Sequence, residues 1–351
     1  MSLVYIDGFD HYATADLPQK GWTVAGTYTD KQSIAATGGR RGSGGLRFTN
    51  LNGVLSAYVI RAVPSQQTII VGFNVNLSAI PQGGSSPWTF FNLLDGATSQ
   101  IALVINNSGS VTVRRGNGTN LGTTSEVLVA GDNYLELRTT IDPTAGAYEV
   151  RLNGVTVLAA TGVNTRQSEN SAVNALSFGV YEAGSTITNS FLMTIDDLYI
   201  ASTAGSTNNY FLGDVRIDTL FPTADGTYSQ FTPSTAGAHY VLVDDPSVNT
   251  TDYVASATPG HRDTFVMASL PATASAAVFG VQVVAAAMRD DAGGRTAALT
   301  VRSGGANADS AAKGLGTTQA FLSAVFETDP AAAAWTATTV NAMEAGLLVA
   351  S

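Results

Sequence analysis

Apolar and polar residues alternate over short segments of five to nine residues along most of the chain. Gly, Asn, Asp and Pro separate these segments, and almost no segment keeps a helical period for three turns. This pattern is typical of β-strands and predicts an all-β protein. Up to residue 202 the predicted strands are Gly45–Thr49, Leu55–Ile60, Gln67–Asn76, Trp88–Leu94, Ile101–Ile105, Ser110–Arg114, Asn133–Ile141, Ala147–Leu152, Val155–Ala159, Ala175–Tyr181 and Leu192–Ile200. So many strands exceed a minimal immunoglobulin-type sandwich and favour a larger jelly roll.

The segment NYLELRTTIDPTAGAYEVRLNGVTVL, residues 133–158, predicts a three-stranded meander. If Ile141 faces Gly146 across the first loop, the residue numbers of each opposed pair sum to 287, which sets the register. One side then carries the apolar pairs Leu135–Leu152 and Leu137–Val150. The other side carries the charged pairs Glu136–Arg151 and Arg138–Glu149. Asn153–Gly154 predicts a type I′ turn, so the meander should have one buried and one solvent-exposed face.

Residues 203–209 have no apolar periodicity and are rich in small polar residues, which is the composition of a linker. We therefore expect a jelly-roll β-sandwich domain over residues 1–202 and a second, smaller β-rich domain over residues 210–351. Its predicted strands are Asp214–Leu220, His239–Val243, Asp263–Met267, Val278–Met288, Arg295–Arg302 and Ala320–Glu327. A short helix within Thr336–Ala345 and a final strand, Gly346–Ala350, should close the chain.

The charge of the chain limits its partners. With 27 acidic and 17 basic residues the net charge is −10, which disfavours nucleic-acid binding because such binding depends on neutralising phosphates. There is no cysteine, which excludes disulfides. The N-terminus lacks the pattern of a signal peptide, and no run of about 20 apolar residues predicts a membrane span. We expect synthesis in the cytoplasm without a signal peptide.

Several segments resemble a known family. The stretches YIDGFDHY, YLELRTTIDPTAGAYEVRLNGVTVL and TIDDLYI are similar to the concanavalin-A-like, laminin-G-like jelly rolls of tailed-bacteriophage virion proteins. FLGDVRIDTLFPTADGTYSQFTPS, TDYVAS, GHRDTF and WTATTVNAMEAGLLVA resemble the C-terminal region that accompanies such jelly rolls. The resemblance implies a structural protein on the virion exterior, as a tail protein or a capsid decoration, in contact with other virion proteins. Appendages of this kind are commonly homotrimers, and the strand VFGVQVVAAAM, apolar on both faces, suits burial in an oligomer.

No catalytic residue can be assigned from the sequence. Glycoside hydrolases need two carboxylates that flank the sugar bond, and in LELR the position of a second acid after Glu136 is taken by Arg138. His11, His239 and His261 lie far apart in the sequence, show no nucleophile or metal spacing, and are interpreted as exposed turn residues. We therefore expect a protein that is not an enzyme.

The stretch TIDDLYI, residues 194–200, places Asp196 and Asp197 side by side. Successive side chains of a strand point to opposite faces, so these carboxylates should not act as a pair. The first and last strands of the resembled fold commonly pair, which would bring Asp7, Asp10 and Asp197 together as candidate ligands of a structural calcium ion, the only cofactor considered. The alternative is that the aspartates accept backbone N–H groups. We expect Asp197, beside Tyr199, to be the less exposed of the pair and to have a depressed pKa.

Aromatic residues give a weak indication of carbohydrate binding. Trp22, Tyr12, Tyr58 and Trp88 could stack on sugars, but Trp88 lies in a segment that reads as a buried strand, which leaves Trp22 as the exposed candidate. The leading hypothesis is a non-enzymatic exterior virion protein that contributes to host attachment. The alternative is a lectin-like tail protein that recognises host-surface glycans, and a polysaccharide-degrading enzyme is the third hypothesis.

Overall fold

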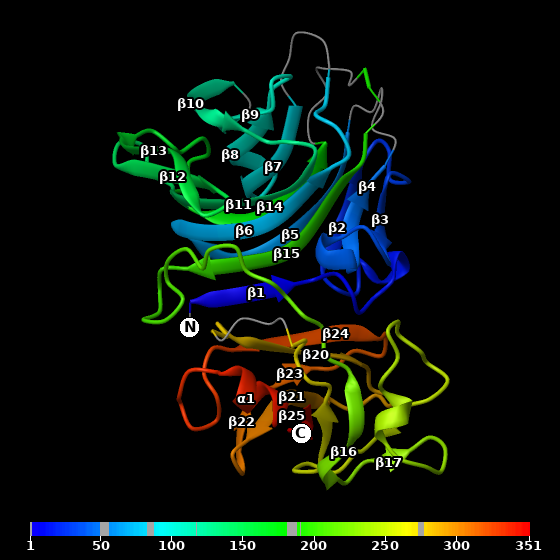
Figure 1. Cartoon of the computed structure of the whole chain (residues 1–351). Coiled ribbons are helices and arrows are strands. Elements are labelled where there is room, and N and C mark those ends of the chain that lie inside the picture. The colour runs from blue at the N-terminus through cyan, green and yellow to red at the C-terminus, as the bar shows by residue number, and fades with distance from the viewer. Residues whose placement is uncertain are drawn as a thin grey trace. The chain divides into compact units, whose positions relative to one another are not determined.

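The computed structural model describes residues 2–49, 56–82, 88–116, 118–180, 188–189, 191–272 and 277–351. The chain divides into two compact units, Met1–Ile217 and Asp218–Ser351. Both consist mainly of antiparallel strands, which confirms the all-β prediction (Figure 1). The predicted linker, residues 203–209, and residues 210–217 after it belong to the first unit. In the described part of the chain, no helix has the length and apolar character needed to cross a membrane.

The first unit is a sandwich of two antiparallel sheets. Its strands are β1 (Leu3–Asp7), β2 (Trp22–Gly26), β3 (Gln32–Ala35), β4 (Gly45–Phe48), β5 (Ala57–Gln66), β6 (Thr68–Leu77), β7 (Trp88–Asp95), β8 (Thr98–Ile105), β9 (Ser110–Arg115), β10 (Thr119–Val127), β11 (Gly131–Thr140), β12 (Gly146–Leu152), β13 (Val155–Val163), β14 (Val173–Val180) and β15 (Met193–Ser202). The larger sheet has the order β13-β12-β11-β6-β15-β4-β3, with β1 also paired to β15, and the second has the order β10-β9-β8-β7-β14-β5-β2. The pairing of β1 with β15 confirms that the first and last strands of this fold lie together.

Alternating apolar residues of the two sheets meet in the core of the sandwich. Phe73 on β6 lies 5.2 Å from Phe91 on β7 and 4.9 Å from Phe178 on β14, measured between ring centroids. Trp88 is buried as expected, but Trp22 is only 1% exposed and stacks in the same core. The prediction of Trp22 as an exposed sugar platform is therefore wrong.

The predicted meander is present with the predicted register. Leu137 faces Val150, and Glu136 faces Arg151, along β11 and β12. Asn153 and Gly154 both have positive φ, as a type I′ turn requires. The apolar side is buried, with Leu137 fully inaccessible to solvent. The alternation of the sequence thus determines which residues of this meander enter the core.

Some strands gave little signal in the sequence. In the first unit the prediction missed β1, β2, β3 and β10; β10, with the sequence TNLGTTSEV, lacks apolar alternation and is mostly exposed. Leu55 and Tyr181, at the ends of two predicted strands, lie outside the described residues.

The second unit is a smaller β structure. Its elements are β16 (Pro222–Ser229), β17 (Thr232–Pro233), β18 (Val254–Ala255), β19 (Arg262–Met267), β20 (Val281–Ala287), β21 (Thr296–Ser303), β22 (Ala306–Asp309), β23 (Lys313–Gly314), β24 (Ala320–Phe326), α1 (Ala337–Asn341) and β25 (Glu344–Val349). One sheet has the order β16-β19-β25-β21-β22, and β20 pairs with β24. Its core contains Leu299, Val301, Trp335 and Val340. Two predicted strands are wrong, since residues 214–220 are irregular and Tyr240–Leu242 forms a 3₁₀ turn.

Candidate functional site on the outer face of the larger sheet

The acidic stretch TIDDLYI forms β15, and its two aspartates lie at a β-bulge. Asp196 pairs with Asn74 of β6, but the next pair is Tyr199 with Gly72, so one extra residue of β15 is accommodated here. Asp197 takes φ +49°, a left-handed conformation that a polar residue adopts at such an irregularity. The bulge shifts the alternation, so that Tyr199 lies on the same face of the sheet as Asp196.

Both aspartates are buried on the outer face of the larger sheet, the face turned away from the second sheet. Asp196 is 1% exposed and Asp197 is 2% exposed, and both bond to the loop that contains Arg40. The predictions that they point to opposite faces, and that Asp197 is the less exposed of the two, are therefore wrong. The physical reason is the bulge, because simple alternation holds only in a regular strand.

Asp196 makes three hydrogen bonds. Its Oδ2 accepts the Arg40 backbone N–H at 2.7 Å and lies 2.7 Å from Ser43 Oγ, and its Oδ1 accepts the Asp197 N–H at 2.7 Å. Burial, together with the neighbouring Asp197 carboxylate, raises the pKa of Asp196 to about 7. Ser43 Oγ also lies 2.6 Å from the Arg40 carbonyl oxygen. Ser43 has a single hydroxyl hydrogen, which can go to that carbonyl oxygen. A protonated Asp196 can then donate its own hydrogen to Ser43 Oγ, so that each short contact has one hydrogen.

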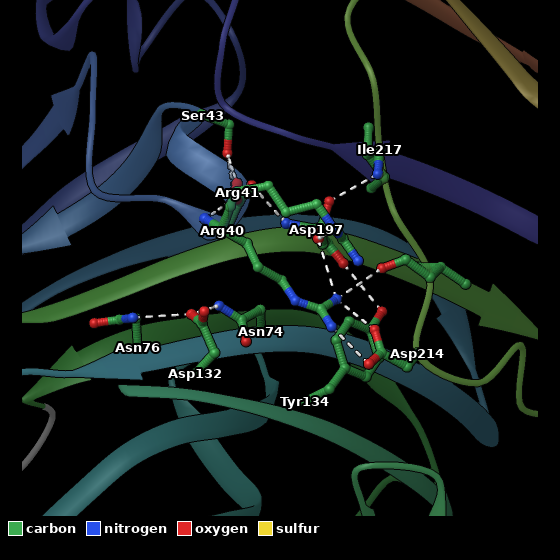
Figure 2. A network of polar contacts seen from close by, with 12 residues as sticks. Arg40, Arg41, Ser43, Asn74, Asn76, Asp132, Tyr134, Asp197, Asp214 and Ile217 are labelled. Carbon is green, nitrogen blue, oxygen red and sulfur yellow. Dashed lines mark hydrogen bonds and ion pairs between the residues drawn. The ribbon is translucent and has the colours of Figure 1, made fainter. Parts of the chain in front are cut away.

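Asp197 connects the arginine loop to the segment that follows the sandwich. Its Oδ1 accepts the Ile217 N–H at 2.7 Å, and its Oδ2 lies 3.1 Å from Arg41 Nη1 and 3.4 Å from Arg40 Nη1 (Figure 2). Burial raises the pKa of Asp197, although the Ile217 N–H and both guanidinium groups oppose that effect. The predicted depressed pKa is therefore wrong, because desolvation outweighs the donors.

Arg40 fastens residues 214 and 215 to the sheet. Its guanidinium lies between Asp197 and Asp214 in Figure 2, with Nη1 and Nη2 each directed at one oxygen of the Asp214 carboxylate. Nη1 also donates to the Val215 carbonyl at 3.2 Å, and the group lies 5.3 Å from the Tyr134 ring centroid. We call residues 210–217, which lie on this face, the strap.

A second contact holds the middle of the strap. Glu136 of β11 is 1% exposed, and its Oε1 accepts the Tyr199 hydroxyl at 2.5 Å and the Gly213 N–H at 2.8 Å. The Tyr199 hydroxyl in turn accepts the Leu212 N–H at 3.2 Å. A Cβ at Gly72 would lie 2.1 Å from Tyr199 Cε1, so only glycine leaves room for this ring. The face predicted to be solvent-exposed is therefore covered at this point by the strap.

A third contact lies at the start of the strap. Arg151 Nε donates to Glu149 Oε1 at 2.9 Å, and the Tyr210 hydroxyl donates to Glu149 Oε2 at 3.1 Å. The Arg151 guanidinium lies 4.2 Å from the Phe211 ring centroid and 5.3 Å from that of Tyr210. Tyr210 is nevertheless 43% exposed. Here the charged pairs expected from the register are replaced by an ion pair within β12, between Arg151 and Glu149, and by contacts with the strap.

The calcium candidates have protein donors of their own. Asp7 is buried and accepts the Phe9 N–H at 2.9 Å, the Tyr12 hydroxyl at 3.0 Å and the Tyr5 hydroxyl. Burial alone would raise the pKa of Asp7, but nearby Lys20 and His11 and these donors lower it below the usual range. Asp10 accepts the Gly44 N–H at 2.6 Å. Among the described residues, no group of three or more histidines or acidic residues is arranged to hold a metal ion.

The histidines do not form a catalytic triad. Nδ1 of His239, in the second unit, lies 2.7 Å from Asp263 Oδ2 and 3.2 Å from Ser229 Oγ. A triad requires the acid and the serine on opposite ring nitrogens, so this buried cluster instead ties a loop to β19. Burial and the adjacent Lys20 lower the pKa of His11 to about 4. The interpretation of His11 and His239 as exposed turn residues is therefore wrong.

Sequence reasoning missed the strap and the residues that hold it. The sequence predicts Glu136 as a member of an exposed charged pair and Tyr199 as a neighbour of Asp197, and it gives no role to Arg40. The one available signal was FLGDVRI itself, which has apolar residues in a segment that does not form a strand. Apolar side chains outside a strand are buried best against another part of the protein, and here they pack on the outer face of the sheet.

Comparisons with known proteins give structural likenesses only. No protein-family model matches the chain, and no curated protein matches it. Similar solved structures include the alginate lyase Aly36B, with a TM-score of 0.37 and 15% identity over 51% of this chain and 86% of that one. The cellulose-induced protein Cip1 has a TM-score of 0.38 and 19% identity over 57% and 91%. A Trypanosoma rangeli sialidase has a TM-score of 0.35 and 12% identity over 57% and 30%.

These likenesses assign no substrate or activity to this chain, but they correct one expectation. Two of the three proteins, the lyase and the sialidase, are enzymes, which overturns the expectation of a protein that is not an enzyme. The lack of a carboxylate pair beside Glu136 speaks only against one mechanism of glycoside hydrolysis, and other chemistries place other demands on a site.

Proposed function

We propose that this chain is a structural component of the exterior of a tailed-bacteriophage particle, as a tail protein or a capsid decoration, in contact with other virion proteins. The sequence supports this proposal through the ordered resemblance that runs through both units. The structural observation that carries it is the strap, which holds the chain leading into the second unit against the sandwich.

An exterior protein of this composition must keep its parts together without disulfides, because it has no cysteine. The Asp197 and Glu136 side chains that bond to the strap are buried, and charge-assisted hydrogen bonds of buried groups are screened by salt far less than surface ion pairs. A strap fastened in this way suits a particle exposed to varied ionic conditions.

Purified particles test this proposal. We expect mass spectrometry to detect the chain in particles, and gold-labelled antibody to mark it on the outside of intact particles. Particles made without the gene provide the control for antibody specificity. Absence of the chain from purified particles, with the protein recovered free in the lysate, would refute the proposal.

We also propose that the protein is a homotrimer. In the second unit, the β20–β24 ribbon has apolar residues on both faces, with Val283 on one and Val284 on the other. An apolar ribbon of this kind gains stability from burial on both sides. Light scattering on the purified chain should give three times the monomer mass, and a stable monomer at micromolar concentration would contradict this.

A second candidate function is recognition of host-surface glycans by the same exterior protein. The observation that favours it is the exposed ring of Tyr210, held among arginine and glutamate side chains on the first unit. A glycan array that includes host capsular and wall polysaccharides tests this function, with the oligomer as probe because several weak sites act together. If no glycan on the array binds the oligomer, this candidate function is refuted.

A further inference from the structure

Arg138 is a cation that lacks its expected partner. The register places it opposite Glu149, but that carboxylate is used by Arg151, by Thr156 Oγ1 at 2.7 Å and by Tyr210. In the part of the chain that the structure describes, no hydrogen bond or ion pair reaches the Arg138 guanidinium, and its Nε is buried. The Nε–H has given up water without gaining an acceptor, and the terminal N–H groups of the half-buried guanidinium have no protein acceptor, so this cation favours binding of an anion.

The Arg138 guanidinium lies over the ring of Tyr210, which is still 43% exposed. The Tyr210 ring centroid is 5.1 Å from Arg138 Cζ and 5.3 Å from Arg151 Cζ. The ring orientation is set by the hydroxyl contact with Glu149 and by Phe211, whose ring is 5.0 Å away. A fixed, exposed ring gives a flat apolar surface, and the C–H face of a sugar ring stacks on such a surface.

We propose that Arg138, Arg151 and Tyr210 form a subsite for an anionic sugar residue of a polysaccharide, a proposal that rests on the glycan-recognition function above. The sugar ring stacks on Tyr210, and its acidic group accepts hydrogen bonds from Arg138. Guanidinium groups pair with carboxylates and sulfates through two parallel N–H donors. A neutral sugar leaves Arg138 without an acceptor, so the subsite discriminates by charge.

Calorimetric titration of the full-length protein with three oligosaccharide probes tests the subsite. The probes are an oligogalacturonate, the same oligomer with its carboxyl groups reduced to alcohols, and a sulfated galactan oligomer. We expect binding of at least one anionic probe and no measurable binding of the reduced probe. The anionic probe that binds more tightly identifies the acidic group as a carboxylate or a sulfate ester.

Matched substitutions locate the binding. Arg138→Gln should weaken binding of the anionic probe at least about tenfold, since a hydrogen bond between charged groups is lost, and Tyr210→Ala should weaken it similarly. Arg138→Lys keeps the charge but not the paired donors, so intermediate affinity is expected. Arg114→Gln on β9 and Tyr253→Ala, which changes an exposed tyrosine of the second unit, should leave affinity unchanged. Unchanged unfolding midpoints confirm that the variants are folded.

The outcomes separate the subsite from the function on which it rests. Glycan binding that survives both Arg138→Gln and Tyr210→Ala would leave glycan recognition intact and refute this subsite. Equal binding of the reduced and anionic probes would also refute it. No binding of any glycan, on the array or by titration, would remove the function and the subsite together.

Discussion

Replacing Tyr199 by phenylalanine tests whether the strap is a structural part of the sandwich. The substitution keeps the buried ring over Gly72 and removes only the hydroxyl, which donates to Glu136 and accepts from the Leu212 N–H. Glu136 would keep a single donor, the Gly213 N–H, because its Oε2 already has no partner among the residues that the structure describes. A buried carboxylate with one donor is poorly compensated.

The magnitude follows from these contacts. Losing a hydrogen bond to a charged group and leaving a half-buried N–H unpaired should together cost about 2–4 kcal/mol of unfolding free energy for the first unit. With a urea dependence of about 3 kcal/mol per molar, the unfolding midpoint should fall by about 1 M. Tyr210→Phe is the matched control on the same strap, because its hydroxyl contact with Glu149 is exposed and should be worth less than about 1 kcal/mol.

Hydrogen exchange read by mass spectrometry at increasing urea suits this two-unit chain, since peptides report on each unit separately. We expect peptides of β11, β15 and the strap to lose protection together at lower urea in Tyr199→Phe, and peptides of the second unit to be unchanged. If Tyr199→Phe and Tyr210→Phe shift the first unit equally, the buried contact has no special weight and the reasoning is refuted.

Three further predictions concern the first unit. Leu137→Ala, in the core, should lower the unfolding free energy of the first unit by about 2–5 kcal/mol in urea titrations. Leu192→Ala, at a partly exposed position, should lower it less, and equal losses would contradict the register. Because the folded pKa of Asp196, about 7, lies above the unfolded value, the folded state binds more protons. Protonated Asp196 therefore contributes fully to the unfolding free energy below about pH 4, and this contribution is lost as the pH rises to about 7. Asp196→Asn should flatten the pH dependence of the unfolding free energy. Because Asp7 and Asp197 have protein donors, chelator and added Ca²⁺ should leave the unfolding midpoint unchanged, and a calcium-dependent rise would establish the metal site instead.

The parts of the fold that could be predicted are those in which neighbouring signals agree. In the meander, the period of two, the charge pairing and the Asn153–Gly154 turn all give one register, and the structure has it. Long-range pairing of β1 with β15 was available only through the family resemblance. The strand β10 was missed because an exposed edge strand carries no apolar alternation to detect.

The candidate site could not be predicted because it depends on two tertiary features. The bulge at Asp197 has no sequence signal, since the residue in the left-handed conformation is not a glycine. Covering of Glu136 depends on where residues 212 and 213 lie, and they are far from it in the sequence. A polar residue at an outward position was therefore interpreted as exposed, which is the usual outcome when no segment covers the sheet.

The strap also determines where recombination could divide this chain. A junction at residue 202 or 209 would uncover Glu136 and Tyr199 and deprive Arg40 of the Asp214 carboxylate, so an incoming sequence would have to supply equivalent groups. A junction after Ile217 would transfer the sandwich with its fastening complete. The smallest unit that recombination could transfer intact is thus the jelly roll together with the strap. Natural chimaeras of this protein should therefore join at or beyond residue 218.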